Sequence, residues 1–297
     1  MTQIQKINPG LIQTYYQKMF ENHSSNENLK ITPENVFQPG NPRNYNLFIE
    51  LVDELMLTGS QVRGVENLSM VLSLLKQNKS VLFLMKHLGN FDVPCFFSLV
   101  SREGKQYNDI LNRLVFIAGR KLNEDSLIVK TFSEVFSRLV IVPLRDFPQK
   151  KYKETPEEMA YRKSFEAEAT RINRAAFRKM VELKKTGHII VLFPEGGRPK
   201  PWLKEELVRE TTSYMKHFDY INFISMNGNI LPVGQDMKDE NPCRDKIVFS
   251  ISEPIISKNF LEESNRLFAQ QTEIKDFALF NVKRVMVEIS RNGSGKS

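Results

Sequence analysis

The sequence predicts an α/β fold: a mixed, largely parallel sheet flanked by helices, with a small N-terminal helical region. Short apolar runs recur from about residue 65 onward, and such runs are typical of buried strands. Amphipathic helical patterns separate most of these runs, which indicates a largely parallel sheet covered by helices. The first 60 residues carry helical patterns and no strand-like run. We therefore expect a helical N-terminal region over residues 1–60 and an α/β domain over residues 61–297.

The first elements follow from periodicity and from typical start signals. Two amphipathic patterns, at residues 11–21 and 45–57, predict the N-terminal helices, which are joined to the rest of the chain near residues 58–60. A helix over 66–77 then leads into the first strand, Val81–Met85, whose five residues are all apolar. Asp92 is predicted to begin the next helix, because aspartate is favoured at helix starts.

The remaining elements repeat this alternation. Strands are predicted at the largely apolar runs 114–118, 139–143, 189–193, 230–233 and 247–251. Helices are predicted near 126–136, 157–185, 204–216 and 274–290. The long helix at 157–185 mixes lysine and arginine with glutamate, which a solvated face explains more simply than a surface for a polyanion.

Composition excludes some classes of protein and leaves several partners open. The 297 residues are 41% hydrophobic, and no apolar run approaches the roughly 20 residues of a membrane-spanning helix. The N-terminus lacks the apolar core of a secretory signal, so we expect a cytoplasmic protein. Lysine and arginine outnumber aspartate and glutamate by 42 to 35, a net charge of +7. This excess favours acidic partners without choosing among a phosphate substrate, an anionic lipid, an acidic carrier protein and nucleic acid.

The two cysteines do not indicate a metal centre or a disulfide framework. Cys95 and Cys243 lie far apart in the sequence, and neither has a second cysteine or a histidine at ligand spacing. We expect two free thiols, with Cys95 in the core beside two phenylalanines.

The segment after the first predicted strand carries the most informative pattern. His87 and Asp92 are separated by four residues, and Gly89 allows a sharp turn between them. Such a turn can return the Asp92 carboxylate to one imidazole nitrogen and leave the other nitrogen to accept a proton. Alternatively, Asp92 only caps a helix and His87 is a polar residue at a strand end, so other segments must decide.

Chemically related residues follow other predicted strands. In open α/β sheets ligands bind beyond the carboxyl ends of the strands. Each of these segments also has a simpler explanation as a turn, a loop or the end of an edge strand. Together, however, a histidine and an aspartate near two arginine-bearing strand ends suit deprotonation of a hydroxyl on a phosphate-bearing substrate. The segments are Gly119-Arg120-Lys121, Pro194-Glu195-Gly196-Gly197-Arg198-Pro199 and Pro232-Val233-Gly234.

These segments resemble, in order and spacing, the four conserved blocks of the glycerolipid acyltransferases. The resemblance covers roughly residues 64–254, and its first and third blocks, at His87 to Asp92 and at 193–198, are the specific ones. The chain is most similar to the soluble, plastid-type glycerol-3-phosphate acyltransferases. It departs from the usual pattern at Lys86, Gly197 and Pro199, which puts the choice of substrate in doubt more than the reaction. The first block also resembles acyltransferases that modify lipid A and related glycolipids.

The resemblance implies transfer of a fatty acyl group from a thioester of coenzyme A or acyl carrier protein to glycerol-3-phosphate. Lysophosphatidate or a glycolipid is the alternative acceptor. In our hypothesis His87 deprotonates the acceptor hydroxyl, and Asp92 sets the tautomer of the His87 imidazole. We expect no acyl-enzyme, cofactor or metal ion. The expected phosphate ligands are Arg120, Lys121 and Arg198, joined by Lys86. The expected substrate-binding residues are Glu195, Gly196 and Gly197, and Glu195 either holds Arg198 or binds glycerol hydroxyls.

Two other classes of function are weighed against this one. A protein that binds nucleic acid or an anionic membrane would explain the charge, but it would not explain the histidine-aspartate pair beside glycine-rich strand ends. A hydrolase is the nearer alternative, but the sequence has no Gly-x-Ser-x-Gly elbow. The three other histidines, at positions 23, 188 and 217, have no candidate catalytic partner at a spacing typical of a hydrolase site. We expect no nucleic-acid partner, and at most peripheral contact with an anionic membrane.

Overall fold

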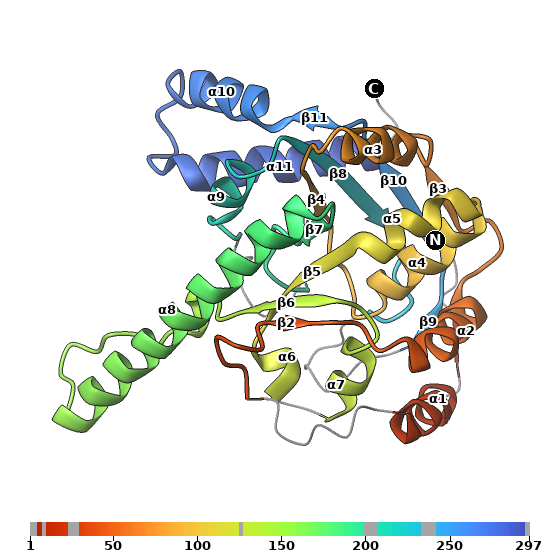
Figure 1. Cartoon of the computed structure of the whole chain (residues 1–297), viewed down its shortest axis with the longest axis horizontal. Coiled ribbons are helices and arrows are strands. Elements are labelled where there is room, and N and C mark those ends of the chain that lie inside the picture. The colour runs from red at the N-terminus through yellow and green to blue at the C-terminus, as the bar shows by residue number, and fades with distance from the viewer. Residues whose placement is uncertain are drawn as a thin grey trace.

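The protein is built around one large mixed sheet, as the sequence predicted. The computed structural model describes residues 5–7, 10–22, 30–124, 127–198, 207–232 and 242–294 (Figure 1). Within these ranges the main sheet has nine strands, eight of them in the order β2-β6-β5-β7-β4-β8-β10-β3, and β11 also pairs with β8. A separate two-stranded sheet joins β1 to β9 antiparallel. The expected α/β class is therefore confirmed.

The strands have the following bounds. They are β1 (Gln5–Lys6), β2 (Phe37–Gln38), β3 (Gln61–Arg63), β4 (Val81–Met85), β5 (Leu114–Gly119), β6 (Arg138–Ile141), β7 (Ile189–Leu192), β8 (Tyr220–Asn227), β9 (Cys243–Arg244), β10 (Val248–Ile251) and β11 (Ile255–Ile256). The parallel neighbours are β6-β5, β5-β7, β7-β4, β4-β8 and β10-β3. The antiparallel neighbours are β2-β6, β8-β10 and β8-β11.

Helices connect most of the strands. They are α1 (Gly10–Glu21), α2 (Tyr45–Leu55), α3 (Asn67–Lys76), α4 (Asp92–Arg102), α5 (Asn108–Arg113), α6 (Lys121–Glu124), α7 (Leu127–Ser133), α8 (Pro156–Lys185), α9 (Thr211–Met215), α10 (Ser257–Phe268) and α11 (Phe277–Ser294). Helix α8 begins with a capping box in which Thr155 and Glu158 bond each other's backbone amides. Figure 1 shows the amino-terminal half of α8 extending away from the sheet. None of the helices in the described ranges is long and apolar enough to cross a bilayer.

The two faces of the sheet carry two separate apolar clusters. Alternate residues of a strand point to opposite faces, so neighbouring residues of one strand belong to different clusters. In β4, Phe83 packs with α2, α3, α4 and α5, whereas Leu82 and Leu84 pack with α8, α10 and α11. Because both faces are covered, every residue of β4 is buried, which explains its unbroken apolar sequence.

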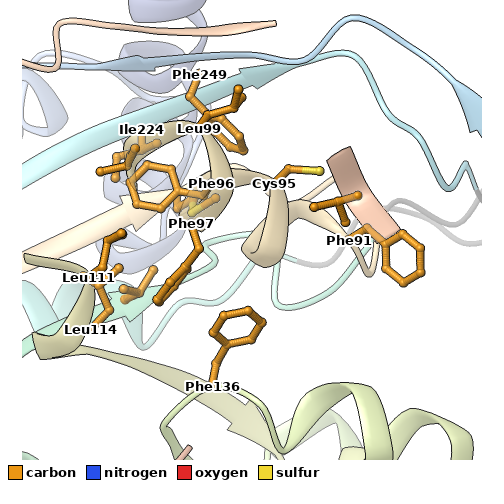
Figure 2. Packing of buried hydrophobic residues seen from close by; sticks show 14 of the residues in the cluster. Phe91, Cys95, Phe96, Phe97, Leu99, Leu111, Leu114, Phe136, Ile224 and Phe249 are labelled. Atoms are coloured by element: carbon orange, nitrogen blue, oxygen red, sulfur yellow. The ribbon is translucent and has the colours of Figure 1, made fainter. Parts of the chain in front are cut away.

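Helix α4 lies at the centre of the face of the sheet to which Phe83 points. Figure 2 shows side chains of α4, from Cys95 to Leu99, and Phe91 directly before the helix, among buried residues that include Ile224 and Phe249 of the sheet and Phe136. Phe96 meets Phe249 edge to face, with ring centroids 5.2 Å apart, and Phe97 lies 4.5 Å from Phe136. Cys95 is fully buried here as a free thiol, as predicted, and burial raises its pKa well above the ordinary value.

The N-terminal region shares this core. Phe48 of α2 is 2% exposed and contacts the rings of Phe91, Phe132 and Phe136, at centroid distances of 5.2, 5.0 and 6.0 Å. The expectation of no strand before residue 60 was wrong, because β2 adds two residues to the edge of the main sheet and β1 pairs with β9. A boundary at residue 60 stays a prediction, and the described contacts run across it.

The main error in the predicted sheet concerns the strand beside β4. A strand was expected at 230–233, but residues 230–232 form no strand, and Val233 and Gly234 lie outside the described residues. The neighbours of β4 are β7, which was predicted, and β8, which the sequence analysis missed. Its apolar run is interrupted by Asn222 and Ser225, both buried, and Asn222 Nδ2 donates to the carbonyl of Ser252 at 2.9 Å.

Smaller differences concern element ends and short helices. The helix predicted at 204–216 is described only as α9, and residues 199–206 lie outside the described ranges. Helices α5, α6 and α10 were not predicted. Strand β6 starts one residue earlier and ends two residues earlier than expected.

The shared core predicts how the N-terminal region unfolds. Phe48→Ala should lower the free energy of unfolding by about 3 to 5 kcal/mol, because it removes a buried ring and leaves a cavity. Tyr152→Ala, at a fully exposed aromatic, should change it by less than about 0.5 kcal/mol. Denaturant unfolding followed by circular dichroism and by a probe on α2 should give one coincident transition. Two separate transitions, with only the first affected by Phe48→Ala, would establish an independent N-terminal unit.

Candidate functional site

The loop after β4 fixes the orientation of His87. The imidazole Nδ1 lies 2.9 Å from Asp92 Oδ2, so the expected pairing is present. Asp92 is the first residue of α4 and its side chain is 2% exposed, whereas that of His87 is 17% exposed. With an ionised Asp92 as acceptor, Nδ1 carries the proton and Nε2 presents a lone pair. No residue in the described part of the chain hydrogen-bonds Nε2.

The Asp92 carboxylate also organises the turn itself. Its Oδ2 accepts the backbone amides of Leu88 at 2.6 Å and Gly89 at 2.9 Å, and its Oδ1 accepts that of Gly89 at 3.0 Å. The carboxylate therefore faces back into the loop that precedes α4. This differs from simple capping, in which a side chain accepts amides of the following helical turn. Asp92 also gains from the positive end of the α4 dipole.

An aromatic ring supports the other side of the imidazole. Phe193, directly after β7, stacks on His87 with ring centroids 4.3 Å apart and planes at 24°. Phe116 of β5 stacks on Phe193 in turn, at 6.2 Å and 20°. The imidazole is thus held at its Nδ1 edge by Asp92 and across its ring face by Phe193.

His87 lies on the wall of a large cavity at the carboxyl ends of β5, β6 and β7. The cavity, about 2100 Å³, has a predominantly apolar lining. Five phenylalanines contribute to this lining and contact one another through their rings, and one of them, Phe116, stacks on the Phe193 that stacks on His87. They are Phe48, Phe91, Phe116, Phe132 and Phe136. A buried arginine and a partly buried tyrosine also reach its wall. Burial lowers the pKa of Arg138 to about 10, against the charge of Glu134, and burial raises the pKa of Tyr214 to about 12.

Cationic side chains gather on the same cavity. Of the residues predicted from the sequence, Lys121, Gly196, Gly197 and Arg198 line it. Lys121 is 62% exposed and pairs with Asp146 at 2.9 Å. The turn after β7 is closed by a bond from the Gly196 amide to the Phe193 carbonyl at 2.8 Å, with Gly196 at a positive φ of 68°.

Besides Arg138, three further cations on the cavity were missed by the sequence analysis. The guanidinium of Arg145, in the loop after β6, lies beside Gly197, where a Cβ would stand 3.4 Å from its nitrogens. Arg209 also lines the cavity and pairs with Asp276 at 2.7 Å, and Lys283 of α11 completes the set. Arg145 follows a predicted strand, as the other candidates do, so a wider search of strand ends could have found it. Arg209 and Lys283 carried no such signal.

Three of the remaining predicted residues, Arg120, Glu195 and Lys86, are not among the residues that line the cavity. Arg120 extends toward α8, where its guanidinium is 5.0 Å from the centre of the Phe165 ring and 3.8 Å from a Glu168 oxygen. Glu195 is buried, with 6% exposure, and Lys86 is partly buried. Pro199 lies outside the described residues. The structure therefore brings Lys121 and Arg198 to one cavity with His87, but not Arg120, Lys86 or Glu195.

Comparisons with known proteins leave the family of this chain open. No protein-family model matches the chain, and no curated protein matches its sequence. Among solved structures, the fold is similar to the 1-acyl-sn-glycerophosphate (LPA) acyltransferase PlsC from Thermotoga maritima. That match covers 96% of this chain and 82% of that chain, with 13% identity and a TM-score of 0.42. Within the described ranges, no group of three or more histidine, cysteine, aspartate or glutamate side chains could hold a metal ion.

The geometry of the loop predicts the effect of Asp92→Asn. The substitution keeps the shape but removes the charge that three donors share, and should cost about 1.5 to 3 kcal/mol of unfolding free energy. It should also weaken the preference for the proton on Nδ1 of His87, which ¹⁵N NMR of the imidazole reports. Asp219→Asn is the matched control, because Asp219 accepts from the Ser80 amide and hydroxyl away from the cavity. Unchanged His87 nitrogen signals in Asp92→Asn would contradict the assigned pairing.

Proposed function

We propose that this chain is an O-acyltransferase that moves a fatty acyl group from a thioester of acyl carrier protein or coenzyme A to a hydroxyl of glycerol-3-phosphate. One observation carries the proposal. A histidine whose Nδ1 is held by a buried aspartate lies on the wall of an apolar cavity that cationic side chains also line. The three parts suit a proton acceptor, a fatty acyl chain and a phosphate group respectively.

The first part acts as the general base. The Nε2 lone pair of His87 accepts the proton of the acceptor hydroxyl as that oxygen attacks the thioester carbonyl carbon. Asp92 stabilises the imidazolium that forms, and Phe193 limits tilting of the ring. When the tetrahedral intermediate collapses, the C–S bond breaks and the imidazolium returns its proton to the departing thiolate. No covalent acyl-enzyme is required.

The second part holds the acyl chain. An apolar chain gains free energy from leaving water, at about 25 cal/mol for each Å² of surface buried. The phenylalanine cluster beside His87 offers such a surface next to the proton acceptor. A thioester whose acyl chain enters this cluster would place its carbonyl carbon near Nε2.

The third part holds the acceptor. One guanidinium group can donate two parallel hydrogen bonds to two oxygens of a phosphate, and a lysine ammonium adds a point charge. Arg198 and Lys121 are retained from the sequence analysis, and Arg145 joins them through its position against Gly197. The side chain of Arg120 is better placed to hold α8 against the sheet than to reach a ligand in the cavity.

Lysophosphatidate is a second candidate acceptor, favoured by one observation. Leu122 and Leu144 line the cavity next to Lys121 and Arg145, yet they are 38% and 62% exposed. A lysophosphatidate bound with its phosphate at these cations could cover both leucines with its own acyl chain. Glycerol-3-phosphate has no chain to do so.

The reaction itself is tested by identifying the product. Purified protein, a palmitoyl thioester and either glycerol-3-phosphate or lysophosphatidate should give an acylated glycerophosphate, detected by mass. Leu144→Ser should raise the apparent KM for lysophosphatidate and leave that for glycerol-3-phosphate unchanged. Release of free fatty acid without any acylated product would make the protein a thioester hydrolase and overturn the proposal.

The base is tested by replacing His87. His87→Gln should lower kcat by about 10²- to 10⁴-fold, the usual contribution of general-base catalysis. His188→Gln is the control, because the His188 Nδ1 bonds Thr186 Oγ1 at 2.9 Å and its ring does not line the cavity. Near wild-type turnover in His87→Gln, with the melting temperature unchanged, would refute this role.

The phosphate site is tested by three single changes. Arg198→Gln, Lys121→Gln and Arg145→Gln should each raise the acceptor KM, by about 10- to 100-fold where a charge-assisted bond of about 1.5 to 3 kcal/mol is lost. The donor KM should change less. Arg120→Gln is the matched comparison and should leave the acceptor KM nearly constant. An equal rise for Arg120→Gln would place that residue among the phosphate ligands instead.

A further inference from the structure

We infer that Asn229 is a positioning residue for the loop that carries His87. Its effect on turnover rests on the proposed function, whereas its effect on the loop does not. Asn229 lies two residues beyond the end of β8, a strand that pairs with β4, and its side chain bridges two segments. Its Nδ2 donates to the Leu88 carbonyl at 3.0 Å, and its Oδ1 accepts the Leu231 amide at 2.9 Å.

The bond to Leu88 controls the amide that faces Asp92. The carbonyl of Leu88 and the N–H of Gly89 belong to one planar peptide group, and in a trans peptide they point in opposite directions. Asn229 holds the carbonyl side of this group, while the Gly89 N–H on the other side donates to both oxygens of Asp92. Rotation of this peptide would therefore break both sets of bonds together. Through Asp92, the same peptide orients the imidazole of His87.

The fit at Gly89 shows how closely the two loops approach. A Cβ added to Gly89 would stand 2.6 Å from Asn229 Oδ1 and 3.1 Å from the Leu231 carbonyl oxygen. Contacts of 2.6 Å are too short for a side-chain carbon, so position 89 has no room for one. The glycine predicted as a turn residue is thus required by close approach of the 229–231 segment.

Asn229 is itself fixed from the far side. Its backbone amide donates to Asp245 Oδ2 at 2.8 Å, and its carbonyl accepts the Cys243 thiol at 3.3 Å. Asp245 is tied by its backbone to Leu55 and Leu57, at 3.3 and 2.9 Å. A continuous set of bonds therefore runs from the end of α2 through Asp245 and Asn229 to the His87 loop.

Asn229→Asp is the most direct test. The substitution keeps an oxygen for the Leu231 amide but places a negative oxygen against the Leu88 carbonyl, which repels it. Asn227→Asp is the matched control, because it adds the same charge two residues away, at an exposed side chain whose Nδ2 donates to the Gly293 carbonyl at 3.4 Å. Asn229→Ser removes the reach to Leu88 without adding charge, and serves if the aspartate variant does not fold.

The first readout is kinetic. Asn229→Asp and Asn229→Ser should lower kcat by about 10- to 100-fold, as misplacement of a reacting group does, with both KM values within about threefold of wild type. A residue that only supports stability would lower the melting temperature and leave kcat of the folded protein constant. Asn227→Asp should match wild type in kcat.

The second readout needs no turnover. The chain has four histidines, so ¹⁵N NMR can follow the His87 ring nitrogens, assigned by their loss in His87→Gln. The wild-type protein should show a protonated, exchange-protected Nδ1, and both Asn229 variants should lose that protection while Asn227→Asp keeps it. If the wild-type protein transfers no acyl group but the signals change as stated, the proposed function fails and the positioning role stands. Unchanged His87 signals in both Asn229 variants would overturn the positioning role.

Discussion

The site depends on the need to satisfy one buried carboxylate. Asp92 is 1% exposed, and an ionised carboxylate removed from water is costly unless donors surround it. Its partners come from the three residues His87, Leu88 and Gly89, at 2.6 to 3.0 Å. The turn must therefore keep the shape that points two amides and one imidazole nitrogen at the same group. The orientation of His87 follows from this requirement, and with it the direction in which Nε2 can act.

The order of the strands surrounds this turn with the groups it needs. Strand β4 lies between β7 and β8, parallel to both, so the loops after all three strands leave the same edge of the sheet. The loop after β7 brings Phe193 onto the imidazole, and the segment after β8 brings Asn229 onto the Leu88 carbonyl. Segments about a hundred residues apart in the sequence thus meet at one point because their strands are neighbours. The cavity opens along the next strands, β5 and β6, where Arg145 and Lys121 lie.

The sequence predicted those parts of the structure that depend on local pattern. Strands that are covered on both faces are usually apolar throughout, so β4, β5 and β7 were visible as unbroken runs. The short spacing of His87 and Asp92 gave their pairing. Strand β8 was missed because the buried Asn222 interrupts its apolar run, and the Nδ2 of Asn222 bonds the Ser252 carbonyl, a distant partner that no local pattern reveals. Arg120 follows a strand as predicted, but spacing does not tell which neighbour its side chain reaches, and it packs on α8. The side chain of Asn229 reaches the His87 loop by a bond to Leu88, 141 positions earlier, which no local pattern reveals.

The positions of the cations on the cavity say more about its ligand than the net charge of the chain does. A net charge of +7 does not by itself select a partner, since many of the cations form ion pairs on the surface, such as Arg113 with Asp109 and Lys179 with Glu182. At the cavity, Lys121 and Arg209 are also paired, whereas Arg145 and Lys283 form no ion pair within the described part of the chain. An anionic ligand there would gain attraction from these two without first displacing a carboxylate. Because an ion pair on the surface contributes little free energy, an anionic ligand could also displace Asp146 from Lys121 with a small loss of stability. The position of the cations around an apolar cavity, rather than their number, therefore favours a ligand that is anionic at one end and apolar at the other.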